Sequence, residues 1–517
     1  MTRRLNPLSD RPVDVLIIGG GIVGACAARD AARRGLAVAL IDRQDFGSGI
    51  SWNSLKIVHG GLRSLQGLDV VQARQFVRER RAWLHIAPHL VEPLPFVVPT
   101  RGHGGESAML VRAGLALNDL VSSDRNEGIS ESRQLPRGRA LSRAELRTLV
   151  PNVFDDYPGG AMFFDAQLYS AERLVQSVLD DAVCAGAFCA SYVEAVAPLR
   201  ASGSLQGAVA EDRLTGDRFD VRASMIINAA GAGAAAVADM LIARSGTAPP
   251  MTGIALNLML DGDEHSTAFA LAAKLDGRLR RLFVVPWRGR TLVGTAHYEC
   301  ARTPQSAAEL EPFVECFVSE VALAWPSRAI TRERVLLVHS GMQPSPHGTA
   351  DTKAHGPPDH LIVDHARDGV PQLLTAIGPK LTTSRAMAEQ LIDIVATRVP
   401  RTTAPCDTAS QPLVSAPGDD VTATVASALR DERAGLPDDV VAHLVRWYGS
   451  NGYDAIVRLV REEPALGARV EEGAPVINAQ LRYGARVEGA TSVEDLIDRR
   501  TELGGTARGG ARARVAA

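Results

Sequence analysis

The pattern of apolar and polar residues near the start of the chain predicts alternating strand and helix. Residues 13–18 form an almost continuous apolar run rich in β-branched side chains, which is typical of a buried parallel strand. Residues 25–35 are rich in alanine and arginine and contain no proline, which favours a helix. Residues 36–42 are apolar again and end in an aspartate, so a second strand is expected there. This order of elements indicates an α/β fold with a parallel sheet.

Three glycines join the first predicted strand to the helix. Gly19, Gly21 and Gly24 have the spacing Gly-x-Gly-x-x-Gly, which allows a tight turn, close approach of a pyrophosphate, and packing of helix on strand. The helix N-terminus offers that pyrophosphate free N–H groups and a positive dipole end. Asp42 ends the second strand, where its carboxylate can accept hydrogen bonds from ribose hydroxyls. Together these features predict a dinucleotide site, and a purely structural glycine-rich turn is the alternative.

Later patterns predict the rest of the organisation. Helices are expected at 74–86, 110–120 and 171–187, and from Gly378 past Ile394. Strands are expected at 96–99, 193–196, 207–210, 218–221, 225–228, 255–260, 282–286 and 291–294, with a hairpin at 361–364 and 373–376. After a linker at 399–417 only helical patterning remains. Cys184 and Cys189 fall on the same predicted helix.

The predicted fold is therefore a discontinuous Rossmann-like cofactor domain with an inserted antiparallel-sheet domain and a C-terminal α-helical domain. We assign residues 1–100, 160–245 and 340–400 to the cofactor domain, 101–159 and 246–339 to the substrate or cap domain, and 401–503 to the helical domain. Residues 504–517 are expected to be a disordered tail.

Composition narrows the class of protein. The 517 residues suit two or three domains, and a net charge of −3 gives no reason to expect nucleic acid binding. The first twelve residues lack the apolar core of a signal peptide, and no apolar run reaches the roughly 20 residues of a spanning helix. The six cysteines have neither metal-ligand nor disulfide-framework spacing, so no metal site and a reducing, cytoplasmic location are expected.

Lysine is scarce, which singles out two positions. Lysines occur only at 56, 274, 353 and 380, and arginine supplies the rest of the 56 basic residues. Because arginine carries the routine surface charge, Lys56 and Lys380 are candidates for sites that need a compact, tunable ammonium group.

The segment after the second strand carries the most specific motif. Residues 53–63 read Asn-Ser-Leu-Lys-Ile-Val-His-Gly-Gly-Leu-Arg. Here the chain resembles the FAD-dependent glycerol-3-phosphate dehydrogenase and oxidase family, within the D-amino-acid-oxidase-like flavoproteins. The resemblance is nearly full-length, since further matching segments lie at 79–80, 87–90, 160–165, 228–231, 285–287, 294–295, 380–383, 448–450, 485–488 and 495–503.

The resemblance implies an FAD-dependent oxidoreductase acting on a CH–OH donor. In the family, C2 of glycerol 3-phosphate gives hydride to flavin N5, a base takes the hydroxyl proton, and dihydroxyacetone phosphate results. Electrons then pass to a quinone or another acceptor, or to oxygen in the oxidases. The implied cofactor-binding residues are Gly19, Gly21, Gly24, Asp42, Ser54, Lys56, His59, Gly60, Gly61, Val193, Gly231, Gly378, Lys380, Leu381 and Thr382.

Four residues are candidates for catalysis. They are His59, Arg63, His297 and Lys380, and the substrate is expected to contact Arg63, Gln343 and Lys380. A fixed positive charge near the flavin stabilises its anionic reduced form, and Gly60 and Gly61 let the backbone approach a flat ring closely. The alternatives are a packed structural histidine at His59, a surface ion-pair partner at Arg63, and a plain polar residue at His297.

Departures from the family gather on the substrate side. Ser64 stands where a tyrosine is usual, Ala255 where a histidine is usual, His297 where an aspartate is usual, Gln343 where an arginine is usual, and Pro379 where a glycine is usual. Residue 252, a threonine, stands in place of a lysine. Glutamine cannot supply the charge with which arginine holds a phosphate, so Arg288 or Arg290 is a candidate to compensate, and His297 to act as a new general base.

Three functions follow from these observations. The first is a glycerol-3-phosphate dehydrogenase. The second is a flavoprotein acting on another hydroxy compound, such as a polyol phosphate or a 2-hydroxy acid, or on an amine. The third is a non-catalytic flavin-binding module. Family dehydrogenases often sit on the membrane to reach quinone, so peripheral contact with the cytoplasmic membrane is a further expectation, although no strongly basic amphipathic stretch is seen.

Overall fold

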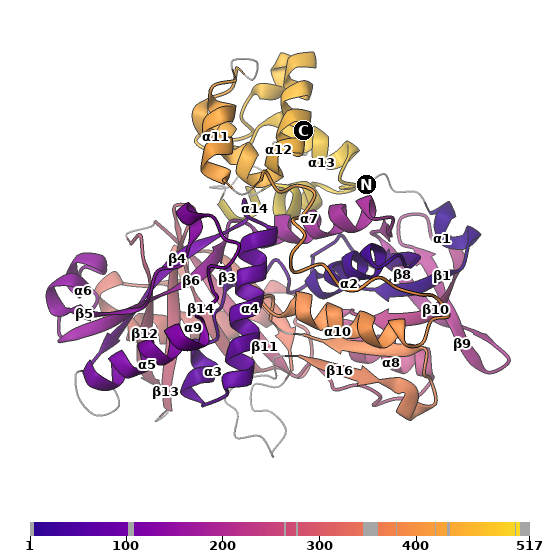
Figure 1. The fold of residues 1–517 in the computed structure, drawn as a ribbon, viewed down its shortest axis with the longest axis horizontal. Helices are drawn as coiled ribbons and strands as arrows, with labels where there is room; N and C mark the ends of the chain where they lie inside the picture. The colour runs from indigo at the N-terminus through magenta and orange to yellow at the C-terminus, as the bar shows by residue number, and fades with distance from the viewer. Residues whose placement is uncertain are drawn as a thin grey trace.

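The computed structural model of the protein contains two β-sheets side by side and a group of C-terminal helices that packs across one end of both (Figure 1). It describes residues 5–101, 108–262, 265–275, 278–344, 360–378, 380–418, 420–431, 435–501 and 503–506. The expected α/β fold with a separate helical C-terminal region is confirmed.

The strands of the described residues are β1 (Val13–Ile18), β2 (Val38–Ile41), β3 (Ile57–Val58), β4 (Val91–Thr100), β5 (Arg139–Ser142), β6 (Gly159–Leu168), β7 (Phe188–Ala190), β8 (Val193–Ala201), β9 (Ser204–Asp212), β10 (Arg218–Asn228), β11 (Gly253–Asp261), β12 (Ala268–Leu275), β13 (Arg278–Trp287), β14 (Arg290–Glu299), β15 (Val335–Gln343), β16 (Leu361–Asp364) and β17 (Leu373–Ile377). The helices are α1 (Asn6–Asp10), α2 (Ile22–Arg33), α3 (Leu62–Gln66), α4 (Val70–Ile86), α5 (Ala108–Val121), α6 (Arg143–Leu149), α7 (Ala171–Cys184), α8 (Ala234–Ile242), α9 (Ala307–Ala324), α10 (Ser384–Ala396), α11 (Val421–Leu429), α12 (Asp438–Glu462), α13 (Asn478–Arg486), a π-helix (Asp495–Arg500) and α14 (Leu503–Thr506).

The first sheet is assembled from segments that are far apart in the sequence. Its strand order is β16-β17-β10-β1-β2-β7, and all neighbours are parallel except β16, which runs antiparallel to β17. Helices α2, α7 and α10 cover one face with a shared apolar core, and the arm of β8 and β9 with α8 contributes to the other (Figure 1). Because ligands of open α/β sheets bind beyond the carboxyl ends of parallel strands, the residues that follow β1, β2 and β10 occupy the expected cofactor edge.

The second sheet has the order β15-β11-β14-β13-β12-β4-β6-β3, with β5 added beside β6. It is antiparallel apart from the short parallel contact of β12 with β4. Helix α9 buries its apolar side, including Val314, Phe317 and Val321, against one face of this sheet. The opposite face of β15 and β11 is covered by the loop before β3, as the close approach of Ile50 to Gly341 and the hydrogen bond from Asn53 to the Ser340 carbonyl show.

Several expected elements differ in detail. Residues 218–221 and 225–228 belong to one continuous strand, β10, because its first half pairs with β9 and its second half with β1. Cys189 lies in β7 rather than on the helix that carries Cys184, since α7 ends and the chain turns back into the sheet. Strands β4 and β6, which include residues assigned to the cofactor domain, pair within the second sheet. Residues 503–506 of the region near the tail form α14, and 507–517 lie outside the described residues.

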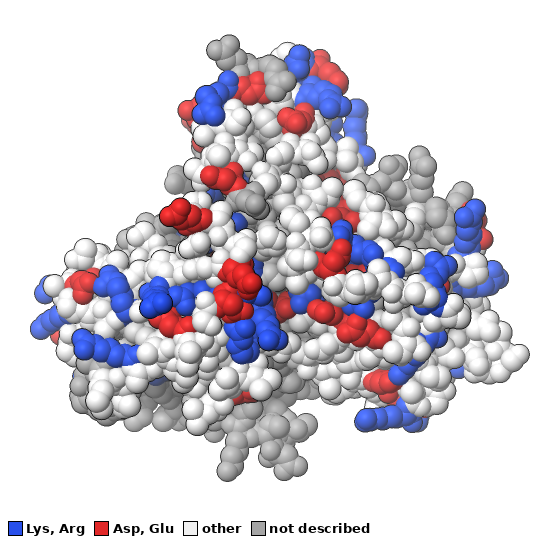
Figure 2. Space-filling view, viewed as in Figure 1, with Lys and Arg blue, Asp and Glu red and all other residues white. Residues whose placement is uncertain are grey.

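Charged side chains of both signs are mixed over the visible face of the molecule (Figure 2). Many of them form ion pairs, for example Arg81 with Asp124 and Glu127 on the surface of α4. No helix within the described part of the chain is long and apolar enough to cross a membrane.

Candidate active site

The turn between β1 and α2 requires glycine at two positions. Gly19 has a φ of +110°, and a side chain there would lie 2.4 Å from the carbonyl oxygen of Ala229 at the end of β10. A side chain at Gly24 would lie 1.9 Å from the carbonyl oxygen of Gly19. Gly21 faces the Ser51 hydroxyl, which accepts a hydrogen bond from the Ile22 N–H. Strand and helix therefore pack closely at this turn, as the glycine motif of a pyrophosphate-binding turn requires.

Asp42 follows β2 and is bonded to this turn. Its carboxylate accepts hydrogen bonds from the N–H of Gly20 at 2.6 Å and of Gln44 at 2.8 Å. Burial raises the pKa of Asp42 to about 6, against the lowering effect of these two hydrogen bonds. The Val193 N–H donates to the Asp42 carbonyl, which places the start of β8 beside the same loop. The sequence predicted only that Asp42 accepts hydrogen bonds from ribose hydroxyls, whereas the structure adds a hydrogen bond that fixes the glycine turn.

His59 faces a buried carboxylate. Its Nδ1 lies 3.5 Å from Oδ2 of Asp165 on β6, and 42% of the His59 side chain is exposed. Oδ1 of Asp165 accepts hydrogen bonds from the Gly60 N–H and the Arg80 guanidinium, both at 2.7 Å. Burial acts to raise the pKa of Asp165, but His59, Arg80 and the Gly60 N–H together hold that pKa below its usual value. The result is an ionised carboxylate that orients an accessible imidazole ring.

The two motifs expected to surround the flavin meet in space. The His59 N–H donates to the Thr382 hydroxyl at 3.0 Å, and the Trp83 indole N–H donates to the Thr382 carbonyl at 3.0 Å. The Lys380 ammonium lies 5.1 Å from the ring centre of Phe76 on α4. Leu381 packs, partly buried, against the core of the first sheet. The segment before α10 and the segment before α3 thus lie against each other.

Glycines 60, 61 and 378 are needed for packing against protein. A side chain at Gly60 would lie 2.0 Å from the Arg80 guanidinium, and one at Gly61 would lie 2.9 Å from Phe76. A side chain at Gly378 would lie 2.8 Å from the Met387 sulfur. Helix α4 therefore occupies the space where side chains at the first two would begin, and close approach of a flat ring to their backbone stays a prediction.

Lys56 is occupied by an ion pair inside the protein. Its Nζ lies 2.9 Å from Glu172 on α7 and donates to the Trp52 carbonyl at 2.7 Å, with 1% of the side chain exposed. The Ser54 hydroxyl accepts from the Lys56 N–H at 3.3 Å. Lys56, one of the two lysines that composition singled out, therefore anchors the loop that carries His59. Sequence reasoning missed Glu172, for which no local motif gave a signal.

The substrate-side departures gather at one end of three neighbouring strands. In the register of β15, β11 and β14, Ala255 lies between His297 and Gly341, and Gln343 lies opposite Gly253. The Gln343 amide nitrogen is 2.5 Å from Nδ1 of His297 and donates to it. This leaves the proton of the neutral ring on Nε2, so that atom acts as a donor, whereas a general base at Nε2 needs the other tautomer.

Comparison with known proteins identifies the family. Residues 14–394 match the FAD dependent oxidoreductase family, and residues 406–516 match the C-terminal domain of alpha-glycerophosphate oxidase. The chain belongs to the FAD-dependent oxidoreductase family. The flavoprotein is 30% identical over 518 residues to a glycerol-3-phosphate dehydrogenase of Synechocystis, covering 97% of this chain and 90% of that protein. It is 32% identical over 504 residues to glycerol-3-phosphate dehydrogenase 1 of Mycobacterium tuberculosis, covering 95% and 91%.

The fold has a close counterpart among solved structures. The glycerol-3-phosphate dehydrogenase from Bacillus halodurans, complexed with FAD, superposes with a TM-score of 0.73 at 24% identity, covering 96% of this chain and 87% of that one. At this identity the likeness shows the fold. The predicted family resemblance and the expected FAD cofactor are both confirmed.

The cofactor edge of the flavoprotein fits the ADP half of FAD. The close approaches at Gly19 and Gly24 bring β1 and the start of α2 together in the tight turn that a pyrophosphate-binding motif needs. Gly231, after β10, has a φ of +55° and no other atom within 4 Å of the position where a side chain would begin. Open space therefore borders the same sheet edge as Asp42. This is the room that a nucleotide needs beside an acidic group and a helix N-terminus.

Neither Arg288 nor Arg290, the two candidates to supply the charge that Gln343 lacks, reaches the position of Gln343. Arg288 stacks on the Tyr169 ring at 4.1 Å and donates to the Tyr169 hydroxyl at 3.1 Å, next to His443 of the C-terminal helices. Arg290 begins β14, seven residues before His297, which is roughly 23 Å along a strand. The side chain of Arg63 and the whole of Pro379 lie outside the described residues. The Ser64 hydroxyl donates to the Gln72 amide at 2.6 Å.

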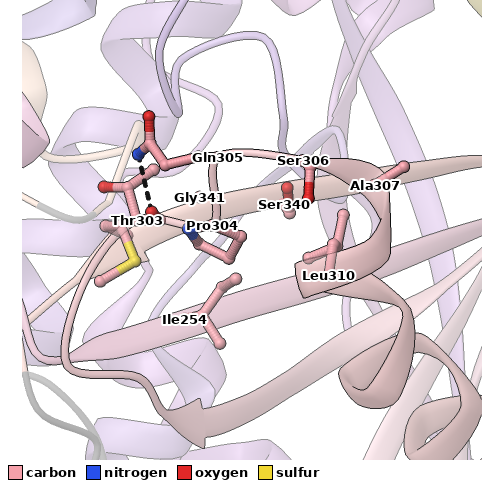
Figure 3. A pocket seen from close by; sticks show the side chains of 10 residues that line it. Ile254, Thr303, Pro304, Gln305, Ser306, Ala307, Leu310, Ser340 and Gly341 are labelled. Atoms are coloured by element: carbon pink, nitrogen blue, oxygen red, sulfur yellow. Dashed lines mark hydrogen bonds between the residues drawn. The ribbon is translucent and has the colours of Figure 1, made fainter.

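A surface hollow of about 310 Å³ lies beside β15 (Figure 3). Ile254 and Met342 line it together with loop residues 303–306 and with Ala307, the first residue of α9. Because successive side chains of a strand point to opposite faces, Ile254 and Met342 point away from the face that carries Ala255 and Gln343. The hollow is therefore separated by the sheet from the cluster of altered residues.

Proposed function

We propose that this flavoprotein oxidises the C2 hydroxyl of glycerol 3-phosphate to the ketone, giving dihydroxyacetone phosphate. The main support is the similarity to enzymes named glycerol-3-phosphate dehydrogenase, which extends over 95–97% of the chain and includes the C-terminal helical region. The His59–Asp165 pair supports it independently, because it supplies an oriented proton acceptor beside the flavin-side motif.

His59 is proposed as the general base. When its Nδ1–H faces the Asp165 carboxylate, Nε2 carries a lone pair that can take the substrate hydroxyl proton. FAD, when bound, supplies the two-electron acceptor for the carbon-bound hydrogen. Lys380 is proposed to contribute positive charge toward the substrate phosphate and the reduced cofactor, and Arg63 to contact the phosphate.

The His297–Gln343 pair is proposed to contact the substrate from the second sheet. It offers an imidazole N–H and an amide instead of a guanidinium, so it can donate hydrogen bonds but supplies less charge. We therefore expect a phosphate to bind more weakly than in a site with an arginine at this position. The consequence is a high KM rather than loss of the reaction.

We also propose that electrons leave to a quinone at a membrane surface. Seven apolar side chains around the end of α3, the start of α4 and the exposed side of α5 are uncovered, and we call them the α4–α5 patch: Leu68, Val70, Val71, Met109, Leu110, Leu117 and Leu120. Val71 is 83% exposed and Leu120 is 72% exposed. Arg74 on α4 donates to the Val121 carbonyl, which places the start of α4 beside the end of α5. Uncovered apolar area of this kind is typical of interaction sites.

Anaerobic mixing with substrate tests the proposed donor. Purified holoprotein mixed with glycerol 3-phosphate should lose the visible absorption of oxidised flavin, whereas glycerol should leave it unchanged. His59→Asn should retain the colour and be reduced about 10²–10⁴-fold more slowly, as expected when a general base is removed. A yellow wild-type protein whose spectrum does not respond to glycerol 3-phosphate would reject the proposal.

Vesicle sedimentation tests the membrane proposal separately. The wild-type protein should pellet with phospholipid vesicles, and Val71→Ser combined with Leu120→Ser should reduce the pelleted fraction. Leu214→Ser, at an apolar side chain that is 51% exposed outside the patch, is the matched control and should pellet as the wild type does. Equal pelleting of all three proteins would exclude the α4–α5 patch as the contact.

A further inference from the structure

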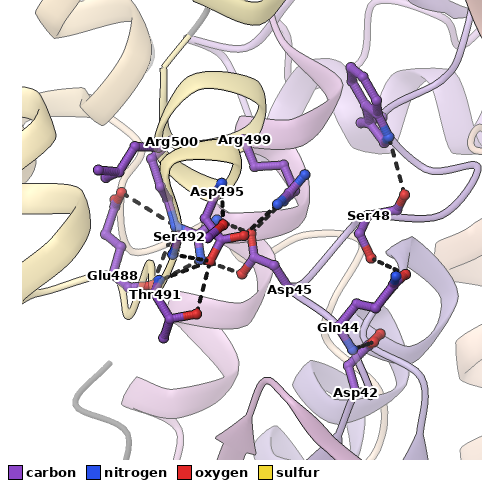
Figure 4. A network of polar contacts seen from close by, with 12 residues as sticks. Asp42, Gln44, Asp45, Ser48, Glu488, Thr491, Ser492, Asp495, Arg499 and Arg500 are labelled. Carbon is purple, nitrogen blue, oxygen red and sulfur yellow. Dashed lines mark hydrogen bonds and ion pairs between the residues drawn. The ribbon is translucent and has the colours of Figure 1, made fainter. Parts of the chain in front are cut away.

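The C-terminal region reaches the cofactor edge through buried charged residues (Figure 4). Arg500 of the π-helix donates to both oxygens of Asp45, at 2.7 and 2.8 Å, and Arg499 donates to one of them at 2.5 Å. The Asp45 and Arg500 side chains are 0% and 1% exposed. A carboxylate removed this completely from water requires such partners, because an unpaired charge is strongly disfavoured inside a protein.

Asp45 belongs to the loop that grips the glycine turn. The next residue, Phe46, lies so close to Gly20 that a side chain at Gly20 would be 2.4 Å from the Phe46 ring. The Gly47 N–H donates to the Gly20 carbonyl at 3.0 Å, and the Gly20 N–H donates to Asp42. The loop from Asp42 to Gly47 therefore holds Gly20, which lies between the first two glycines of the motif, by both its N–H and its carbonyl.

The same loop is tied to the π-helix by a second route. The Tyr192 N–H donates to the Gln44 carbonyl at 3.1 Å, and the Tyr192 hydroxyl donates to Asp495 at 2.7 Å. Asp495 in turn pairs with Arg499. Two chains of hydrogen bonds thus join the π-helix to residues 44 and 45.

Docking of the C-terminal helices does not depend on these contacts alone. Helix α12 also meets the remainder of the protein through His443, which hydrogen-bonds with Tyr169 at 3.0 Å, and through an ion pair of Arg446 with Glu92 at 2.8 Å. The contacts of Asp45 with Arg499 and Arg500 differ from these two because they lie next to the glycine turn between β1 and α2.

We propose that Arg499 and Arg500 are positioning residues for FAD, through which the C-terminal domain holds the ADP end of its site in shape. Without them the Asp45 carboxylate would move toward water and carry Phe46 and Gly47 away from Gly20. The turn would then lose the arrangement that meets the pyrophosphate, and the affinity for any ligand with an ADP group would fall. The proposal rests on family membership and on no assumption about the substrate.

Ligand binding to full-length apoprotein tests this inference. Arg500→Gln should raise the dissociation constants of FAD and of ADP by about tenfold or more, the scale of one lost charge-assisted hydrogen bond, measured by calorimetry. Arg446→Gln is the matched control because it removes another ion pair of the same helical domain, and it should change both constants by less than about twofold. The use of ADP restricts the readout to the end of the site next to Asp45.

Several outcomes would overturn the inference. One is an Arg500→Gln protein with a native circular dichroism spectrum and wild-type affinity for both ligands. Another is an equal loss of affinity in Arg446→Gln, which would show that any weakening of domain docking has this effect. If Arg500→Gln does not fold, Arg500→Lys is the variant to test, because it keeps the charge but loses the bidentate hydrogen bond to Asp45. It should bind ADP more weakly than the wild type, and unchanged affinity in that variant would equally contradict the proposal.

Discussion

Replacement of Asp165 by asparagine tests whether the carboxylate beneath His59 is structurally required. Asp165 and Arg80 are 8% and 4% exposed, and the carboxylate also accepts from the Gly60 N–H. Asp165→Asn removes the charge that balances Arg80 and leaves a guanidinium buried without a counter-ion. Breaking a buried pair in this way costs about 3–5 kcal/mol of unfolding free energy. We expect a loss of that size in urea denaturation with FAD present in excess.

A double-mutant cycle separates the pair from the packing around it. Arg80→Met should cost a similar amount, because it leaves the Asp165 carboxylate unbalanced. The double variant should lose less than the sum of the two, with a coupling of about 0.5–3 kcal/mol, since no charge remains buried. Arg81→Met, next along α4, removes pairs with Asp124 and the exposed Glu127 and should cost about 1 kcal/mol or less. Additive single effects, or a loss below about 1 kcal/mol in Asp165→Asn, would refute the reasoning.

Three further predictions follow from single positions. Gly24→Ala should yield protein without bound flavin, seen as loss of visible absorption, because the added Cβ would lie 1.9 Å from the Gly19 carbonyl oxygen. The control is Gly114→Ala, which should keep its flavin because the added Cβ would have open space within 4 Å. Burial lowers the pKa of His89 to about 3, so the unfolded chain binds more protons than the folded protein between pH 6.5 and 3. The free energy of unfolding should therefore fall as the pH falls through that range, by about 2 kcal/mol from pH 6.5 to 5. His89→Leu should flatten this dependence in urea titrations at several pH values. Gln343→Arg should lower the KM for glycerol 3-phosphate by about tenfold, the scale of one charge-assisted hydrogen bond, and an unchanged KM in steady-state assays would show that residue 343 does not meet the phosphate.

The start of the fold could be predicted because its signals are local. An apolar run, a glycine spacing and a terminal aspartate specify β1, the turn, α2 and β2 within thirty residues, and the structure confirms that unit. Parallel strands buried on both faces produce a continuous apolar run that few other elements share. The match to family motifs assigned residues 59 and 382 to one cofactor site, and the structure adds the contact between the two segments, which no local pattern contains.

Other features could not be predicted because their partners are distant in sequence. Lys56 looked like a cofactor ligand from its motif, and its partner Glu172 lies on a helix more than a hundred residues away. Arg288 looked like a substrate ligand from its position near a strand turn, yet it stacks against Tyr169 and the C-terminal helices. A sequence pattern shows which side chains carry charge, but the identity of the neighbour is decided by tertiary packing.

The wide spacing of the segments in the first sheet has a consequence for synthesis of the chain. β10 pairs with β1 and with β17, so the central strand's second neighbour leaves the ribosome only after residue 377. Asp45 gains its arginine partners later still, when residues 499 and 500 emerge. Long-range pairings of this kind slow folding and lengthen the time for which apolar strands are exposed. We therefore expect nascent chains that stop before residue 490 to be recognised by chaperones and degraded.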